Sequence, residues 1–283
     1  MSIKRVGVVG CGLMGSGITE VCARAGYAVV VREVNDELLQ RGLGYIQKSL
    51  AKGVSKGKLA ESERDATWDR ITGTTDLTAF ADCDLVIEAV IENLDEKKRV
   101  FAALDGVTPG HAILASNTSS LSVTEMAAAT QRPEQVMGVH FFNPVPVMPL
   151  IEIVRTFLTS DDTYVTARTF AEGLGKQVVV TKDNPGFIVN ALLVPFLLDA
   201  IRMFEAGVAT REDIDNAVKL GLNHPMGPLT LADFVGLDTT LFIADAVYEE
   251  LKDPRYAATP LLRRMVTAGH MGRKSGKGFY DYT

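Results

Sequence analysis

The chain has 283 residues, of which 47% are hydrophobic, and its formal net charge at pH 7 is −6. The length suits one large domain or two smaller ones, and the apolar share suffices for a substantial buried core. The acidic balance argues against a broad nucleic-acid-binding surface, which requires a basic field. The three cysteines, Cys11, Cys22 and Cys83, are too few and too scattered for a disulfide framework or a zinc site.

The sequence also argues against a membrane or secreted protein. A strand is expected from Arg5 onward, which leaves no room for a signal peptide. The longest apolar run, residues 187–198, is too short to span a bilayer and contains Asn190 and Pro195. We therefore expect a reduced, cytoplasmic protein without a metal site.

Short apolar strands alternate with helices through the first two thirds of the chain. Strands of this kind are typical of a mostly parallel sheet that is covered by helices on both faces. Asn93 and Ser122, each followed three residues later by a glutamate, predict the starts of two helices. The expected strands are 5–9, 28–31, 84–89, 112–115, 136–140, 150–154 and 177–181, and the other expected helices are 13–25, 35–58 and 162–174.

Beyond residue 181 the strand signals end. Residues 183–186 contain a proline and a glycine that break the pattern, and helices are expected at 186–206, 210–221, 228–251 and 259–268. The predicted fold class is therefore α/β: a doubly wound, mostly parallel sheet in residues 1–183, followed by a smaller all-helical domain in residues 184–283.

A glycine-rich turn joins the first strand to the first helix. Gly10, Gly12 and Gly15, with Leu13 and Met14 between them, form the pattern G-x-G-x-x-G where a Rossmann-type dinucleotide-binding fold requires it. The first glycine permits a tight turn, the second lets backbone amides approach a pyrophosphate, and the third lets helix and strand pack closely. The positive end of the helix favours the phosphates. The same turn without a cofactor is the alternative.

The second strand ends in two charged residues that bear on the choice of cofactor. Glu33 stands where a carboxylate would bind the adenosine ribose hydroxyls and repel a 2′-phosphate, which favours NAD. Arg32 beside it weakens this inference, because an arginine can turn toward a 2′-phosphate. NADP therefore stays an alternative.

The most informative stretch is residues 138–154. His140 ends one apolar run and Glu152 lies within a second, with three prolines and Asn143 between them. A carboxylate in a β-like run is costly unless it has a partner, and a histidine oriented by a carboxylate is the core of a general-base device. We expect the prolines to fold the second strand back so that the two side chains meet. The alternative is a core histidine beside an unrelated glutamate.

Several motifs occur together in one order: residues 10–15, 116–120, 140–144, 184–190, 224–228 and 272–280. With them the chain resembles the 3-hydroxyacyl-CoA dehydrogenase family, and most of all its stand-alone bacterial 3-hydroxybutyryl-CoA dehydrogenases. The resemblance covers essentially the whole chain. It implies reversible hydride transfer between a nicotinamide cofactor and the 3-hydroxy or 3-oxo group of a short-chain acyl-CoA, and a homodimer formed through the helical domain.

The resemblance also implies site residues. His140 would be the catalytic base and Glu152 its orienting carboxylate. Ser119 would bond the substrate 3-oxygen, and Asn190 would contact the substrate from the second domain. Cofactor contacts are implied for Glu92, Lys97, Asn117, Asn143 and Lys274, and coenzyme A contacts for Ser49, Lys52 and Lys56.

The alternatives differ in what they require of these residues. A related dehydrogenase of a free hydroxy acid or sugar acid would need no coenzyme A site. Lys48, Lys52 and Lys56 share one helical face that suits the phosphates of coenzyme A, although such a face is often merely solvated. A non-catalytic dinucleotide-binding protein would have no need of the catalytic set that His140 and Glu152 complete.

Overall fold

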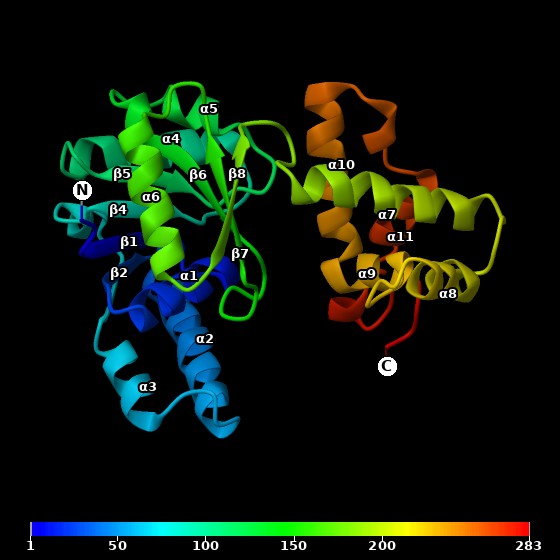
Figure 1. Ribbon diagram of the computed structural model, residues 1–283, viewed down its shortest axis with the longest axis horizontal. Helices are drawn as coiled ribbons and strands as arrows, with labels where there is room; N and C mark the ends of the chain where they lie inside the picture. Colours follow the sequence, from blue (N-terminus) through cyan, green and yellow to red (C-terminus); the bar gives the residue numbers. More distant parts are fainter. Residues whose placement is uncertain (1, 283) are drawn as a thin grey trace. The chain divides into compact units, whose positions relative to one another are not determined.

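The computed structural model describes residues 2–282, which form two compact units that meet between Asn184 and Pro185 (Figure 1). The first unit is α/β and the second is helical, which confirms the predicted fold class. The first unit contains strands β1 (Arg5–Val9), β2 (Ala28–Arg32), β3 (Ile71–Thr74), β4 (Leu85–Glu88), β5 (Ile113–Ser116), β6 (Val136–Phe141), β7 (Leu150–Arg155) and β8 (Gln177–Lys182), with helices α1 (Leu13–Arg24), α2 (Asp36–Ser55), α3 (Glu61–Trp68), α4 (Leu94–Val107), α5 (Val123–Ala127) and α6 (Asp161–Gly173).

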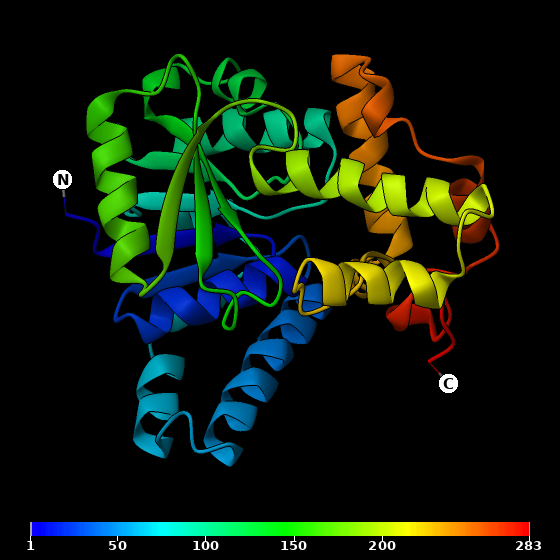
Figure 2. The same cartoon turned by 45° about the vertical axis from the view of Figure 1, so that its right-hand side comes forward.

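Helices α2 and α3 extend away from the sheet of the first unit as a hairpin (Figure 2). Helix α2 begins where the Asn35 side chain accepts a hydrogen bond from the backbone N–H of Leu38. Helix α3 is absent from the sequence prediction. Only Thr67 of its eight residues is buried, so the segment has no apolar period by which to recognise it.

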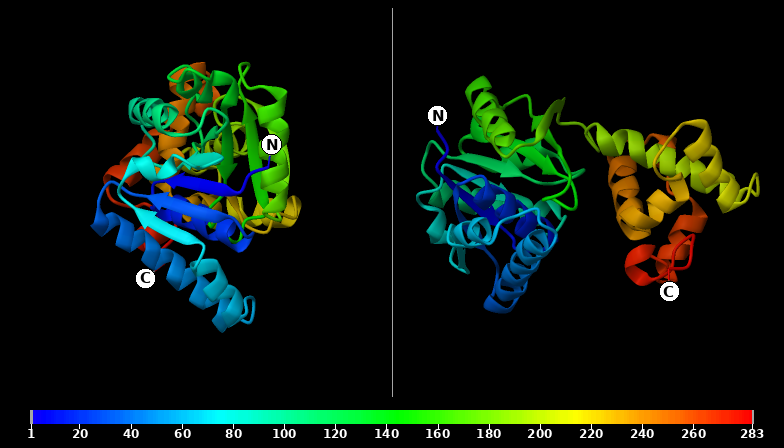
Figure 3. Two further views of the ribbon diagram at one scale, coloured as in Figure 1. Left: turned by 90° about the vertical axis from the view of Figure 1, so that its left-hand side faces the viewer. Right: turned by 60° about the horizontal axis from the view of Figure 1, so that its bottom comes forward.

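The eight strands follow the order β3-β2-β1-β4-β5-β6-β7-β8, with β3 at one edge (Figure 3, left panel). Neighbouring strands are parallel except for β6 and β7, which are antiparallel. The prediction missed β3, whose sequence Ile-Thr-Gly-Thr offers a single large apolar residue. The strand expected at 84–89 is therefore the fourth in the chain and not the third.

Helices cover both faces of this sheet, as the apolar strands predict. Ile18 of α1 and Phe170 of α6 belong to the apolar core on one face. On the other face, a Cβ atom added to Gly138 of β6 would lie 3.3 Å from Val123 of α5. Successive residues of a strand point to opposite faces, so His140 shares the α5 face with Gly138.

Polar side chains occupy that face at the carboxyl ends of the parallel strands. Glu88 of β4 is the register partner of Ser116 of β5, which in turn is the partner of Gly138 of β6. His140 lies two residues beyond Gly138 and is paired with Glu152 of β7. The carboxyl ends of parallel strands are where open α/β sheets bind ligands.

The second unit contains α7 (Val189–Glu205), α8 (Arg211–Gly221), α9 (Pro228–Val235), α10 (Leu237–Leu251) and α11 (Pro260–Thr267). The prediction of one helix over 228–251 is wrong, because Gly236 has a φ of +104° and separates α9 from α10. Pro195 lies inside α7 and has no N–H to donate. The carbonyl of Ala191, one turn earlier, instead accepts a hydrogen bond of 2.9 Å from the Tyr256 hydroxyl.

The last residues of the second unit fold back onto a buried aspartate. Asp233 is 1% exposed and accepts hydrogen bonds from the backbone N–H groups of Phe279 and Tyr280, both at 2.9 Å, and from the Tyr282 hydroxyl at 3.0 Å. Burial raises the pKa of this carboxyl group. The C-terminal segment therefore supplies the donors that make a carboxylate tolerable at this position.

Candidate active site

The glycine-rich turn has the geometry that its pattern predicts. Gly10 has a φ of +96°, and a Cβ atom added there would lie 2.5 Å from the carbonyl oxygen of Ala89. A Cβ atom on Gly15 would lie 1.8 Å from the Gly10 carbonyl oxygen, whereas one on Gly12 would meet nothing within 4 Å. The first and third glycines are thus needed for packing, and the second leaves the backbone open to a ligand.

The start of α1 is equally open to an anion. Leu13 is 65% exposed and Met14 is half-buried against the core of the first unit. The first turn contains no acidic residue, and Gly12 at the cap position has no side chain to bond the first amides. These amides and the helix dipole together provide a site for a phosphate group.

The two charged residues after β2 point in different directions. The Glu33 carboxylate accepts hydrogen bonds of 2.8 Å from the backbone N–H groups of Cys11 and Val34, so it lies against the glycine-rich turn. The Arg32 side chain donates through Nε to the carbonyl oxygen of Thr75 at 3.2 Å. Glu33 is therefore the residue held beside the dinucleotide turn, and Arg32 is anchored to the segment after β3.

The predicted meeting of His140 and Glu152 is present in the structure. Nδ1 of His140 lies 2.8 Å from Oε2 of Glu152, and the two residues are 6% and 0% exposed. The antiparallel turn-back after β6 brings them into register across two strands. The Phe142 ring lies against the imidazole, with the ring centroids 4.5 Å apart. Phe142 was missed from the sequence, where nothing sets it apart from its neighbour Phe141.

Asn117 joins the segment after β5 to the end of β6. Its side-chain oxygen accepts a hydrogen bond of 2.9 Å from the backbone N–H of Phe141, the residue after His140. The sequence indicated a cofactor contact for Asn117, and the structure adds this bond, which fixes the backbone beside the histidine.

Three further predicted residues form one network. Nζ of Lys97 lies 2.9 Å from Oε2 of Glu92, and Oε1 of Glu92 accepts from the backbone N–H of Ser119 at 2.9 Å. Lys97 is only 1% exposed and also pairs with Glu88 at 2.6 Å. Glu88 was not identified from the sequence, although a carboxylate that closes an apolar strand was an available signal.

The other predicted residues have separate surroundings. Lys48 and Lys52 of α2 are exposed, as is Lys56 at its C-terminal cap, and Ser49 is a half-buried residue of the same helix. Asn143 is exposed on the loop after β6. In the second unit, Asn190 is 8% exposed on α7, and Lys274 forms an ion pair of 2.6 Å with Asp238.

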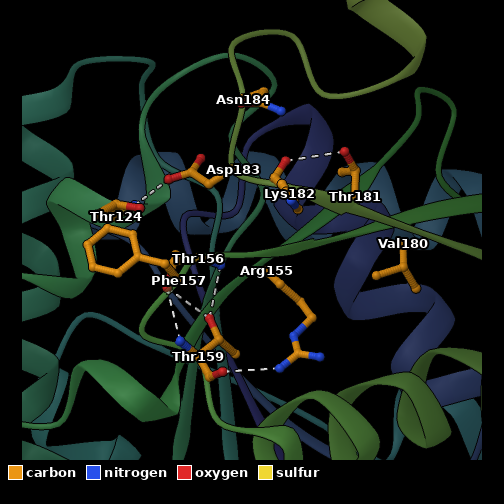
Figure 4. Close-up of a pocket in the computed structure, with 10 residues that line it drawn as sticks. All are labelled: Thr124, Arg155, Thr156, Phe157, Thr159, Val180, Thr181, Lys182, Asp183 and Asn184. Atoms are coloured by element: carbon orange, nitrogen blue, oxygen red, sulfur yellow. Dashed lines mark hydrogen bonds between the residues drawn. The ribbon is translucent and has the colours of Figure 1, made fainter.

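A pocket of the first unit lies away from these residues, at the ends of β7 and β8 (Figure 4). Because β7 runs antiparallel to β6, the end of β7 that lines the pocket lies beside the start of β6, whereas His140 lies near the end of β6. Arg155 lines the pocket but donates to the Thr159 carbonyl and to Asp161. Asp183 there accepts from the backbone N–H groups at the start of α5. The pocket is therefore separate from the pair of His140 and Glu152.

No helix within residues 2–282 has the length and apolar character needed to cross a membrane. Within the same range, no group of three or more His, Cys, Asp or Glu side chains is placed to hold a metal ion.

A dinucleotide-binding turn together with a buried histidine–carboxylate pair is the arrangement that a nicotinamide-dependent oxidoreductase needs. The family model for the 3-hydroxyacyl-CoA dehydrogenase NAD-binding domain matches residues 5–184, and the model for the C-terminal domain of the same enzymes matches residues 186–282. The chain belongs to the 3-hydroxyacyl-CoA dehydrogenase family, as the sequence motifs predicted.

Individual relatives are similar to this chain over nearly their full lengths. A 3-hydroxybutyryl-CoA dehydrogenase of Mycobacterium tuberculosis is 56% identical over 283 residues, which are 99% of each chain. The crystal structure of M. tuberculosis FadB2 is similar with a TM-score of 0.98 and 55% identity, covering 100% of both chains. That of the (S)-3-hydroxybutyryl-CoA dehydrogenase PaaH1 of Ralstonia eutropha has a TM-score of 0.95 and 43% identity, also over 100% of both chains.

Proposed function

We propose that the protein catalyses the reversible, NAD-dependent interconversion of (S)-3-hydroxybutyryl-CoA and acetoacetyl-CoA. The contact of 2.8 Å between His140 and Glu152, at the carboxyl end of the parallel strands, is the observation that carries this proposal. The substrate comes from the relatives in M. tuberculosis and R. eutropha, whose names specify 3-hydroxybutyryl-CoA.

The proton transfer is assigned to His140. Its Nδ1 faces Glu152, so Nε2 is the ring atom that exchanges the proton of the substrate hydroxyl group. Glu152 fixes the tautomer and stabilises the imidazolium that forms when alcohol is oxidised. In the reducing direction the imidazolium returns the proton to the 3-oxygen. Ser119 is proposed to bond that oxygen, and Asn190 is proposed to contact the substrate.

The residues present fit a nicotinamide dinucleotide. The open backbone at Gly12 and the start of α1 suit the pyrophosphate, and Glu33 suits the adenosine ribose. When bound, the nicotinamide supplies the hydride chemistry. The residues proposed at its end of the cofactor are Glu92, Lys97, Asn117, Asn143 and Lys274.

NAD is the proposed cofactor in preference to NADP. A carboxylate beside the ribose repels a 2′-phosphate, and Glu33 is fixed there by two backbone N–H groups. Arg32, the residue that the sequence offered as a partner for a 2′-phosphate, instead donates to the Thr75 carbonyl. This orientation of Arg32 supports NAD, which is one of the two cofactors that the sequence left open.

The exposed lysines of α2 are proposed to meet the phosphates of coenzyme A. Lys52 lies in the last turn of α2 and Lys56 caps the end of this helix, which extends away from the sheet of the first unit (Figure 2). Both side chains are exposed. Ser49 is proposed to contribute from the same helix, through its hydroxyl group.

The second unit is proposed to form a homodimer, and the protein to act in the cytoplasm. Exposed apolar side chains on its helices, among them Leu192 at 71% and Leu220 at 83%, suit burial against a second copy. The three buried cysteines are free thiols, which fits a reducing compartment. A monomer in light scattering at micromolar concentration would contradict the dimer.

One assay tests the activity. Oxidation of NADH or NADPH is followed with acetoacetyl-CoA and, separately, with free acetoacetate. We expect turnover of the thioester with a preference for NADH. Turnover of the free acid alone, or of neither compound, would contradict the proposal.

A further inference from the structure

Strand β4 ends in a carboxylate that is completely shielded from solvent. Glu88 is 0% exposed. Its Oε1 accepts hydrogen bonds from Lys97 Nζ at 2.6 Å and from the backbone N–H of Val90 at 2.7 Å, and its Oε2 accepts from the Ser116 hydroxyl at 2.6 Å. Both oxygens act as acceptors, as an ionised carboxylate requires.

Stability alone is a weak reason for this arrangement. A buried ion pair must recover the cost of removing both charges from water, and apolar residues of the same size often serve a core at least as well. The neighbouring positions Leu85, Val86 and Ile87 show that this strand is otherwise apolar and fully buried. We therefore ask which other residues the charged pair of Glu88 and Lys97 holds in place.

One path from Glu88 leads to Ser119 through two charged side chains. Lys97, held by Glu88, reaches Glu92 at 2.9 Å. Glu92 in turn accepts from the Thr118 hydroxyl at 2.6 Å and from the Ser119 backbone N–H at 2.9 Å. Both oxygens of the Glu92 carboxylate are thus occupied, one by Lys97 and the other by the segment that carries Ser119.

A second path reaches the same segment through a hydroxyl group. Ser116 donates to Glu88 and accepts from the backbone N–H of Thr118 at 3.1 Å. Because its single proton is given to Glu88, the oxygen of Ser116 is left as an acceptor for Thr118. The backbone from Ser116 to Ser119 is therefore fixed from two sides, and each side depends on Glu88.

We propose that Glu88 is a positioning residue for the reaction, which acts through Lys97, Glu92 and Ser116 to set the place of Ser119 relative to His140. This inference rests on the proposed function, because it takes Ser119 as a substrate contact. Glu88 itself touches neither the substrate nor the cofactor. A displacement of about 1 Å at a reacting centre can cost about 100-fold in rate, so loss of this support should appear in turnover.

The test compares Glu88→Gln with a matched variant at the other end of the same strand. Asp84 directly precedes β4 and accepts from the backbone N–H groups of Lys4 and Arg5 at 2.7 and 3.0 Å. The kcat for acetoacetyl-CoA is measured per NADH-binding site, counted by fluorescence titration, so that unfolded molecules do not contribute. We expect kcat to fall about 100-fold in Glu88→Gln and to stay at the wild-type value in Asp84→Asn, although both lower the melting temperature.

A milder variant keeps the proposal testable if Glu88→Gln does not fold. Ser116→Ala removes only the second path, and we expect it to fold and to lower kcat about tenfold, short of the loss in Glu88→Gln. Wild-type kcat per site in every Glu88 and Ser116 variant that folds would overturn the proposal. An inactive wild-type enzyme would instead contradict the proposed function, and the two failures are thereby distinguished.

Discussion

The region around His140 and the lysine-bearing face of α2 are both polar, but the fold treats them differently. His140 and Glu152 are buried, lie opposite each other across two strands and are joined by a contact of 2.8 Å. Lys52, in the last turn of α2, and Lys56, at its C-terminal cap, are exposed. A buried polar side chain must find a hydrogen-bond partner within the protein, so only a few of its conformations have a low free energy. An exposed charged side chain is hydrated by water in many conformations. The geometry around His140 therefore limits the possible functions far more than the exposed lysines do.

The sharpest test of this contrast is His140→Ala. Loss of a positioned base should lower kcat by about 10²–10⁴-fold, while NADH binding is retained because the dinucleotide turn lies on other elements. His111→Ala is the matched control, since His111 is an exposed histidine paired with Asp84 at 3.2 Å. Near-normal turnover of His140→Ala would remove it as the base.

Glu152→Gln should have the next largest effect. The amide keeps the shape and can still accept from the imidazole, but it supplies no negative charge to the imidazolium. At about 4 Å and an effective dielectric constant of about 20, that charge is worth up to about 4 kcal/mol, so we expect kcat to fall about 10²–10³-fold. Glu125→Gln, at an exposed carboxylate, is the control. An equal loss in both variants would point to a general effect of removing charge.

Replacing the carboxylate of Glu33, which is proposed to bind the adenosine ribose, should act on the selectivity between NADH and NADPH more than on the rate. Glu33→Gln is expected to lower the preference for NADH over NADPH about tenfold, because a charge-assisted hydrogen bond is replaced by a neutral one. The neighbouring substitution Arg32→Ala should change the ratio of kcat/KM for NADH to kcat/KM for NADPH only little, because Arg32 donates a hydrogen bond to Thr75. A selective loss of NADPH turnover in Arg32→Ala would show that the arginine binds a 2′-phosphate.

The smallest effect is expected on the exposed face. Lys52→Ala combined with Lys56→Ala should raise the KM for acetoacetyl-CoA about 3–10-fold at low salt and leave kcat unchanged, because each exposed ion pair is worth about 0.2–1 kcal/mol. The difference from wild type should shrink as salt is added. Lys219→Ala, an exposed lysine on α8, serves as control. An unchanged KM would assign the α2 lysines to solvent alone.

The sequence predicted what depends on burial and on strict backbone geometry. Gly10 and Gly15 were identifiable because a Cβ atom at either would collide with a carbonyl oxygen, so the pattern carries its own structural reason. The contact of His140 with Glu152 was identifiable because a carboxylate within an apolar strand has to find a partner. Their catalytic roles stay predictions.

Where burial leaves no pattern in the sequence, the structure was missed or wrongly predicted. Lys97 and Lys98 are adjacent in a polar helix, yet one is 1% exposed and the other lies on the surface. Only the three-dimensional position of Glu88, nine residues earlier at the end of β4, separates them. Similarly, β3 is short and polar, and the break at Gly236 lies within a continuous apolar pattern.

The bonds to Asp233 have a consequence for how the chain matures. Its partners Phe279, Tyr280 and Tyr282 are made 46 to 49 residues later. At about 5–20 residues per second, the ribosome adds them roughly 2–10 s after the aspartate. Until then the helical unit cannot close over Asp233 without burying an unpartnered carboxylate. A chain that lacks residues 279–282 would stay in this open condition, and we expect proteases to digest its helical unit faster than that of a chain that has them.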